Sequence, residues 1–212
     1  MAGTITALKF QKRNPERVNV FLDGKYAFAL MATEAALLHK GQQVSDEEIA
    51  AWVAQDGQQQ AYDQALRFLS YRPRSQAEVE HHLHAKRASA EVIAVVIERL
   101  RQAGYLDDQL FARFWVENRQ QFRPRSRRAL EHELRQKGVG RQVIASAMSG
   151  LDDETAAWQA LEGQLERWTQ LSNEELRQKI AGFLGRRGFN YDTINSVYRR
   201  ACQQLRTDPE DP

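Results

Sequence analysis

The sequence predicts a mainly α-helical protein: an elongated tandem array of three three-helix repeats, preceded by a small N-terminal β-hairpin or three-strand extension with helices. Three observations lead to this prediction. An aromatic-Arg-Pro-Arg-Ser motif at 71–75 returns fifty-one residues later at 122–126. Apolar residues after each copy recur at helical spacing. From about residue 61, Pro73 and Pro124 are the only prolines before the tail, and both fit helix starts.

The first part of the chain has the pattern of strands rather than helices. Apolar residues alternate with other residues in three short runs, at 5–10, 18–22 and 25–30. Asp23 and Gly24 separate the second run from the third, and this dipeptide is a strong signal for a tight hairpin turn. We therefore expect three short antiparallel strands.

Two short helices are expected after the strands. The first covers about 33–39. The second opens with a capping box in which Ser45 and Glu48 satisfy each other's backbone donors. We place the N-terminal extension at 1–56 and expect its joint to the rest of the chain at 57–60, where a glycine precedes three glutamines.

The repeat unit is about fifty residues long, and we expect it at 57–106, 107–151 and 152–206. In each unit the last helix has apolar residues at positions i, i+1, i+4, i+5 and i+8, except that Thr193 occupies position i of the third copy. Such modules bury small cores of their own and stack on their neighbours. The final residues, 207–212, are short, acidic and rich in proline, and we expect a disordered tail.

Composition excludes several classes of protein. Hydrophobic residues make up 42% and charged residues 27% of the 212, which is typical of a globular domain and not of a disordered or fibrous chain. No apolar run approaches the roughly 18 residues of a membrane span. A single cysteine, Cys202, cannot form an internal disulfide, so we expect a cytoplasmic protein with a structural cysteine.

The sequence contains no arrangement typical of an enzyme. It has no glycine-rich phosphate loop, no serine nucleophile elbow and no zinc-binding histidine pair of the known motifs. His81 and His84 lie one helical turn apart, but no matching ligand pair occurs elsewhere, and a solvated helix face is favoured over a metal site. We expect no catalytic residue, no metal and no cofactor.

The distribution of charge is more informative than the net charge of +2. Between Arg113 and Arg141 there are nine Lys and Arg but only three Glu, with Phe114, Trp115 and Phe122 among them. Clustered cations with nearby aromatic rings suit a phosphate backbone or an acidic protein surface. The candidate residues for binding DNA or an acidic protein are Arg72, Arg74, Lys86, Arg87, Arg123, Arg125, Arg127, Arg128, Arg135, Lys137, Arg186 and Arg187.

For two groups within this set, a structural explanation has to be weighed against a binding function. Lys86, Lys137 and Arg187 end their helices, where a cation offsets the helix dipole, so structure and function are about equally good explanations for them. The four arginines at 123–128 flank a helix start, where the dipole and free backbone N–H groups favour anions. An anionic partner is therefore the simpler account of Arg123, Arg125, Arg127 and Arg128.

The sequence resembles the RecX family of bacterial recombination regulators over essentially its full length. The resemblance lies in three stretches that are specific in combination: 65–75 with Leu83, Lys86 and 104–108 after it; 126–139; and 186–194. The strands at the start resemble an extension found in only some branches of the family.

The resemblance implies a modulator, chiefly an inhibitor, of the RecA recombinase. It implies binding to RecA filaments on single-stranded DNA, along the filament groove, and suppression of ATP hydrolysis, strand exchange and co-protease activity. It therefore implies a role in homologous recombination, DNA repair and the SOS response. The expected partners are the RecA filament and single-stranded DNA, contacted directly or through RecA, with no membrane and with the protein a monomer.

Several alternatives stay open at this point. The sequence does not decide whether the protein caps the RecA filament, lies within its groove or dismantles it. Nor does it distinguish the basic residues that would touch DNA from those that would touch RecA. Two other functions also fit the residues. One is a stand-alone nucleic-acid-binding protein that uses the basic second repeat, and the other is a helical-repeat scaffold for a different acidic protein.

Overall fold

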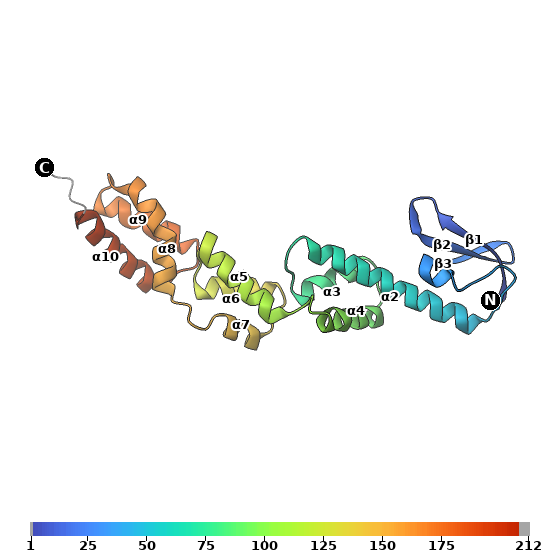
Figure 1. Ribbon diagram of the computed structural model, residues 1–212. Coiled ribbons are helices and arrows are strands. Elements are labelled where there is room, and N and C mark those ends of the chain that lie inside the picture. Colours follow the sequence, from blue (N-terminus) through green and yellow to red (C-terminus); the bar gives the residue numbers. More distant parts are fainter. Residues whose placement is uncertain (1, 208–212) are drawn as a thin grey trace. The chain divides into compact units, whose positions relative to one another are not determined.

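The computed structural model describes residues 2–207. The chain forms two compact units (Figure 1). Unit 1 comprises the chain up to Arg72 together with Val79–Tyr105, and unit 2 comprises Pro73–Glu78 together with the chain from Leu106 onward. Among the described residues, no helix combines the length and the apolar character that crossing a membrane requires. The expected tail lies outside the described residues apart from Thr207, which ends the last helix.

Unit 1 begins with an antiparallel sheet of strand order β3-β2-β1-β4. Its strands are β1 (Gly3–Gln11), β2 (Asn14–Leu22), β3 (Lys25–Met31) and β4 (Gln43–Val44). The three predicted strands are confirmed, whereas the two-residue β4, which pairs with the start of β1, was not predicted. Asp23 and Gly24 both have positive φ, 48° and 81°, as a tight hairpin turn between twisted strands requires.

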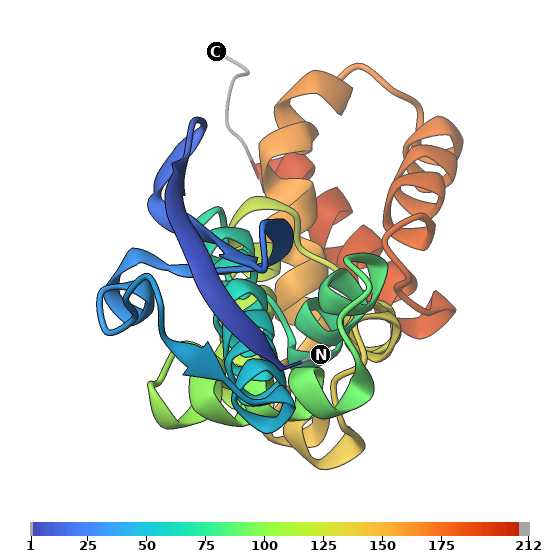
Figure 2. The ribbon, with the colours of Figure 1, turned by 90° about the vertical axis from the view of Figure 1, so that its right-hand side faces the viewer.

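One face of this sheet forms the core of the N-terminal region. Ile5, Val20 and Leu30 are fully buried there, and Phe28 packs against Trp52 of the following helix with ring centroids 6.1 Å apart. The helix predicted at 33–39 is only a single turn, α1 (Ala32–Ala35), followed by turns. Figure 2 shows the sheet in front, with β1 crossing the view as a long dark blue strand.

The second predicted helix begins as expected but does not end as expected. The Ser45 hydroxyl accepts a hydrogen bond from the Glu48 N–H, and the Glu48 carboxylate accepts one from the Ser45 N–H, so the capping box is confirmed. The helix α2 then runs without a break from Asp46 to Ser70. The predicted joint at 57–60 therefore lies within a continuous helix and not in a break between elements.

A buried ion pair accounts for the continuity of α2. The Asp56 carboxylate accepts bonds from the Arg17 guanidinium at 2.9 and 2.7 Å and from the Gln60 side chain at 2.6 Å. Asp56 is only 5% exposed, so these contacts hold the helix at the residue that precedes the glycine. The cost of roughly 1 kcal/mol for Gly57 within a helix is small beside the loss of this arrangement.

The prediction of three three-helix repeats is confirmed, and residues 61–206 contain no strand. The second half of α2 forms the first repeat with α3 and α4, and η1 is a short 3₁₀ turn within the third repeat. The remaining elements are α3 (Gln76–Ala85), α4 (Ala90–Gln102), α5 (Asp108–Phe122), α6 (Arg127–Gln136), α7 (Arg141–Ala147), α8 (Asp153–Leu165), η1 (Glu166–Trp168), α9 (Asn173–Gly185) and α10 (Tyr191–Thr207).

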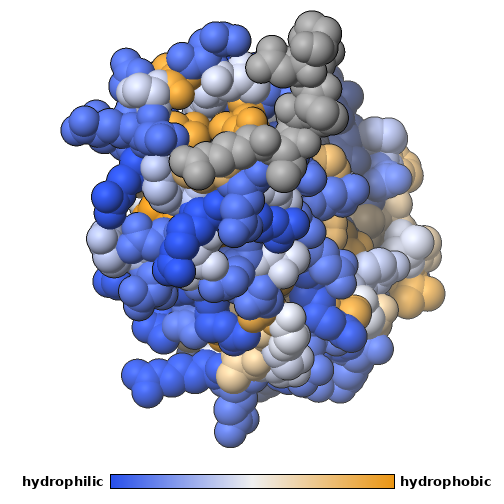
Figure 3. Space-filling view, turned by 90° about the vertical axis from the view of Figure 1, so that its left-hand side faces the viewer, coloured by the Kyte–Doolittle hydropathy of each residue, from blue (hydrophilic) through white to orange (hydrophobic). Residues whose placement is uncertain are grey.

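Each repeat buries the apolar stripe that its sequence predicts. In unit 1 the stripe of α4 is buried at Ile93, Val96, Ile97 and Leu100. In unit 2 the second and third repeats have cores centred on fully buried leucines. Cys202 is partly buried against the core of the third repeat, in agreement with a structural role. Figure 3 shows the face of unit 2 that carries α9 and α10, where hydrophilic residues cover most of the surface and hydrophobic ones reach it only in small patches.

Candidate functional site

The structure places most of the predicted basic residues in one unit, but not all of them. Unit 2 contains Arg74, Arg123, Arg125, Arg127, Arg128, Arg135, Lys137, Arg186 and Arg187. The other three candidates, Arg72, Lys86 and Arg87, belong to unit 1. Of these, Lys86 and Arg87 are exposed just beyond the end of α3. The candidate site is therefore built in unit 2.

Four arginines of unit 2 converge from two repeats, and we call them the arginine cluster: Arg123, Arg125, Arg186 and Arg187. Burial and the positive charges of the other three lower the pKa of Arg187 below its ordinary value. The Arg187 guanidinium lies over the Phe183 ring, 3.7 Å from its centroid. Since like charges crowded together disfavour their own charged forms, an anion bound here would relieve the repulsion.

The main chain holds the two parts of the arginine cluster together. The Ser126 N–H donates to the Arg187 carbonyl at 3.1 Å, and the Ser126 hydroxyl donates to the Gly188 carbonyl at 2.7 Å. Ser126 is 1% exposed and also caps α6, because its hydroxyl accepts a bond from the Ala129 N–H. The serine of the repeated motif is therefore a junction between the second and third repeats.

The same junction occurs once more within unit 2. The Ser75 hydroxyl donates to the Lys137 carbonyl at 2.5 Å, and the Gln76 N–H donates to the Asp108 carboxylate at 2.8 Å. In the second copy, the Arg127 N–H donates to the Asp153 carboxylate at 2.7 Å. The recurrence of the motif in the sequence thus reflects a recurring contact between one repeat and the next.

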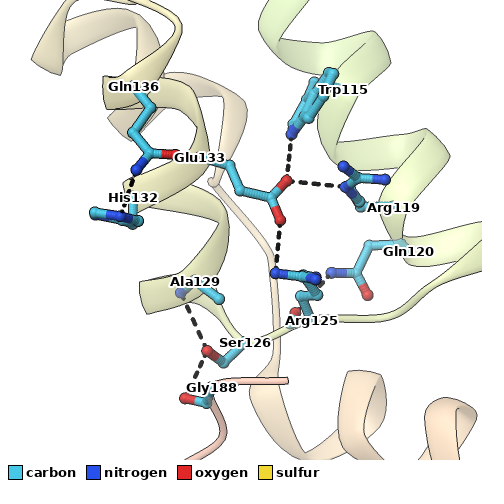
Figure 4. A network of polar contacts seen from close by, with 10 residues as sticks. All are labelled: Trp115, Arg119, Gln120, Arg125, Ser126, Ala129, His132, Glu133, Gln136 and Gly188. Carbon is cyan, nitrogen blue, oxygen red and sulfur yellow. Dashed lines mark hydrogen bonds and ion pairs between the residues drawn. The ribbon is translucent and has the colours of Figure 1, made fainter. Parts of the chain in front are cut away.

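Glu133 organises a second group of side chains next to the arginine cluster (Figure 4). Its carboxylate accepts bonds from the Trp115 indole at 2.7 Å and from Arg119 at 2.9 Å, and it pairs with Arg125 at 2.9 Å. Trp115 and Arg119 come from α5, Glu133 comes from α6, and Arg125 comes from the loop between them. The Glu133 side chain is only 14% exposed, so this ion-pair network is largely shielded from water.

Trp115 is the centre of a cation–π arrangement. Arg119 and Lys137 lie over its ring, 4.5 and 4.4 Å from the centroid. Lys137 also pairs with the Glu78 carboxylate at 3.1 Å. Trp115, Arg119 and Lys137 line an open pocket of about 580 Å³ together with Arg125 and Glu133. Lys137 therefore does more than offset the dipole at the end of α6.

The expectation for the start of α6 is corrected in two respects. Two of its backbone N–H groups are not free for an outside anion, because Asp153 and Ser126 already accept bonds from Arg127 and Ala129. Two of the four arginines at 123–128 have structural partners: Arg125 pairs with Glu133, and the Arg127 side chain donates to the Leu151 carbonyl at 2.9 Å. The physical reason is that residues later in the sequence occupy these groups: the carboxylates of Asp153 and Glu133 and the carbonyl of Leu151.

Exposed cations without a counter-ion are the remaining candidates for a partner. In the part of the chain that the structure describes, Arg123, Arg128 and Arg186 are exposed and have no carboxylate within ion-pair distance. Arg135 is exposed but pairs with Glu131 at 3.1 Å on the same helix. Arg74 lies within 3.9 Å of the Glu78 carboxylate and is largely buried.

Sequence reasoning missed the roles of Trp115, Arg119 and Glu133. Trp115 and Arg119 are four residues apart, which puts them on one face of a helix and was a usable signal. Glu133 lies eighteen residues from Trp115, and no local pattern links the two. Only the packing of α5 against α6 makes Glu133 the common partner of three side chains.

We expect replacement of Glu133 with Ala to lower the free energy of unfolding by about 2 kcal/mol, because Arg119 and Arg125 then face each other without a counter-ion. The matched control is Glu131→Ala on the same helix. Glu131 has an exposed ion pair with Arg135, so its removal should change stability by less than about 0.5 kcal/mol. Urea unfolding followed by circular dichroism measures both values, and equal effects of the two changes would contradict the role given to Glu133.

Comparison with protein families gives four consecutive matches along the chain. Residues 3–45 match the N-terminal domain of the regulatory protein RecX, and 61–100, 107–148 and 152–198 match the first, second and third three-helix domains of RecX.

Individual relatives are similar over most of their length. The chain is 39% identical over 198 residues to the protein named regulatory protein RecX of Bacillus subtilis, covering 91% of this chain and 75% of that one. It is 30% identical to the protein of the same name from Clostridium perfringens, covering 93% and 96%. A crystal structure of regulatory protein RecX has a TM-score of 0.67 at 25% identity and covers 93% of this chain. The structure of RecX from Lactobacillus salivarius, at 22% identity and a TM-score of 0.61, is similar in fold.

Proposed function

Because the chain belongs to the RecX family, we propose that it regulates RecA, chiefly as an inhibitor that binds RecA filaments on single-stranded DNA. In this role it suppresses ATP hydrolysis, strand exchange and co-protease activity, acts as a monomer, and requires neither a cofactor nor a catalytic residue. Its relatives are named as regulatory proteins and not as enzymes.

The arginine cluster is the observation that best supports this proposal. It gathers like charges that depress the pKa of Arg187, and its exposed members Arg123 and Arg186 have no carboxylate partner among the described residues. A filament on DNA offers phosphates and acidic side chains, both of which lower the repulsion within the cluster. Arg128, exposed on the first turn of α6, is a further unpaired cation among the described residues of unit 2.

The direct test measures ATP hydrolysis by RecA on single-stranded DNA while the protein is titrated in. We expect inhibition at less than one molecule per RecA, because an array of repeats that touches several filament subunits acts below a one-to-one ratio. Unchanged hydrolysis at a twofold excess over RecA would show that the proposed function is wrong. Equal affinity for naked DNA and for the filament would instead favour a stand-alone nucleic-acid-binding protein.

A triple replacement of the unpaired cations tests the site itself. We expect Arg123→Ala, Arg128→Ala and Arg186→Ala together to weaken filament binding at least tenfold and to flatten its salt dependence, by roughly 0.7 in the log–log slope for each phosphate that the variant no longer binds. Stability should stay close to that of the parent, since these side chains are exposed and unpaired.

The matched control for this triple variant removes the same charge from exposed positions outside the cluster: Lys40→Ala, Arg167→Ala and Lys179→Ala. This control distinguishes a specific site from a general effect of net charge. If the two triple variants bind the filament equally well, the arginine cluster is solvated surface and not a binding site.

A further inference from the structure

The sheet of unit 1 has a second face that the core does not use. Cross-strand partners have their side chains on the same face, and Leu8, Val20 and Phe28 are partners on the core side. The residues between them therefore point the other way. They form two rows: Ala7, Phe21 and Tyr26 in one, and Lys9, Asn19 and Ala29 in the next. None of these six belongs to the buried core of the sheet.

Two aromatic rings and a lysine meet on this face, and we call Lys9, Phe21 and Tyr26 the aromatic face. The Phe21 and Tyr26 rings lie edge to face with centroids 6.0 Å apart. The Lys9 ammonium is 5.1 Å from the centroid of the Phe21 ring. Tyr26 is 59% exposed even though it lies within a strand. An exposed ring held at its edge by a second ring is a rigid platform for stacking.

The strands that carry the aromatic face contain more cations than anions. Between Gly3 and Met31 there are five Lys and Arg but only two Asp and Glu. Lys12 and Arg13 are exposed in the turn between β1 and β2, at the end of β2 away from Phe21, and the exposed Lys25 pairs with Leu22 on the other face. Arg17 is not available to a partner, because its guanidinium is paired with the Asp56 carboxylate. Among the described residues of the sheet, Lys9 is the cation that contacts the rings.

We propose that the aromatic face of unit 1 binds single-stranded nucleic acid, with a base stacked on Tyr26 and an adjacent phosphate held by Lys9. Every base has a flat face that stacks on an aromatic ring, and paired bases inside a duplex do not present it. Charge complementarity favours this occupant over a protein, because the patch is small, carries Lys9 beside its rings and is bordered by the polar Asn19 and Gln11, which bond to each other at 2.8 Å. This surface is separate from the arginine cluster and needs no RecA.

The test uses the full chain and a fluorescently labelled thymidine oligonucleotide of about 16 nucleotides, with binding followed by anisotropy and without RecA. We expect Tyr26→Ala to weaken binding at least about fivefold, the lower end of the effect for one stacked base, whereas Tyr26→Phe keeps the ring and should bind within twofold of the parent. The matched control is Tyr105→Ala, because Tyr105 is also 59% exposed in unit 1 and should leave binding unchanged.

The salt dependence separates stacking from charge. Lys9→Ala should reduce the log–log salt slope by roughly 0.7, whereas Tyr26→Ala should weaken binding and leave the slope unchanged. Parent-like thermal unfolding of each variant confirms that the sheet is intact. Parent-like binding by Tyr26→Ala would overturn the proposal. So would a variant that binds the oligonucleotide normally but inhibits RecA less, since the face would then contact protein. Either result leaves the proposed function standing, because that function is tested by RecA hydrolysis with the parent chain.

Discussion

Replacing Asp56 with Ala is expected to lower the free energy of unfolding of unit 1 by about 3–5 kcal/mol. The change leaves the Arg17 guanidinium, whose side chain is 13% exposed, without its counter-ion and without two hydrogen bonds. The hydrogen bonds and charge of Asp56 raise the pKa of Arg17 above its ordinary value, so Arg17 stays charged and cannot escape the cost by losing its proton. An unpaired buried charge is the most expensive single defect available in this unit.

Two further variants make this prediction specific. Asp63→Ala is the control on the same helix, because Asp63 accepts a bond only from Gln59 and pairs with no arginine among the described residues; its removal should cost less than about 1 kcal/mol. The double change Arg17→Met with Asp56→Leu should recover most of the stability, since it replaces both partners with apolar groups. Urea unfolding measures all three. An effect of Asp56→Ala no larger than that of Asp63→Ala would show that the ion pair contributes little.

Replacing Gly138 with Ala is expected to lower stability by about 2–4 kcal/mol, as measured by urea unfolding. Gly138 has a φ of 75°, where a side chain costs roughly 1 kcal/mol or slightly more. A Cβ there would also overlap the Cβ of Ala77, which is fixed to the backbone of α3, so the helix itself would have to move. Overpacking of this kind adds about 1–3 kcal/mol.

Gly104 is the matched control for the cost of placing a side chain at positive φ. Its φ is 74°, and a Cβ at this glycine meets no atom within 4 Å, so Gly104→Ala should cost only the strain of about 1 kcal/mol. Adding Ala77→Gly to Gly138→Ala should restore part of the stability, in a double-mutant cycle with favourable coupling. Equal effects of Gly138→Ala and Gly104→Ala would show that the overlap with Ala77 is relaxed at no cost.

The environments of the candidate binding residues were partly predictable from the sequence, and the reason differs from residue to residue. Arg123 and Arg186 were identified as candidates from the clustering of charge along the chain, and the structure leaves them exposed and unpaired. The same argument assigned Arg125 and Arg127 to an outside anionic partner. In the structure Arg125 pairs with Glu133, and the Arg127 side chain donates to the Leu151 carbonyl. Local charge counts do not reveal an acceptor supplied by a later helix.

The sequence by itself determined the features whose causes lie within a few residues of one another. The capping box at Ser45, the turn at Asp23 and Gly24 and the apolar stripes of the repeats depend on neighbours one or two turns away, and periodicity or residue type reveals them. Tertiary structure alone decided that α2 continues past Gly57, that Asp153 occupies the start of α6 and that Glu133 joins three side chains. Each of these depends on partners that local patterns do not link, up to 39 residues away, and the energy of a charged contact depends on distance in space, which spacing along the chain does not specify.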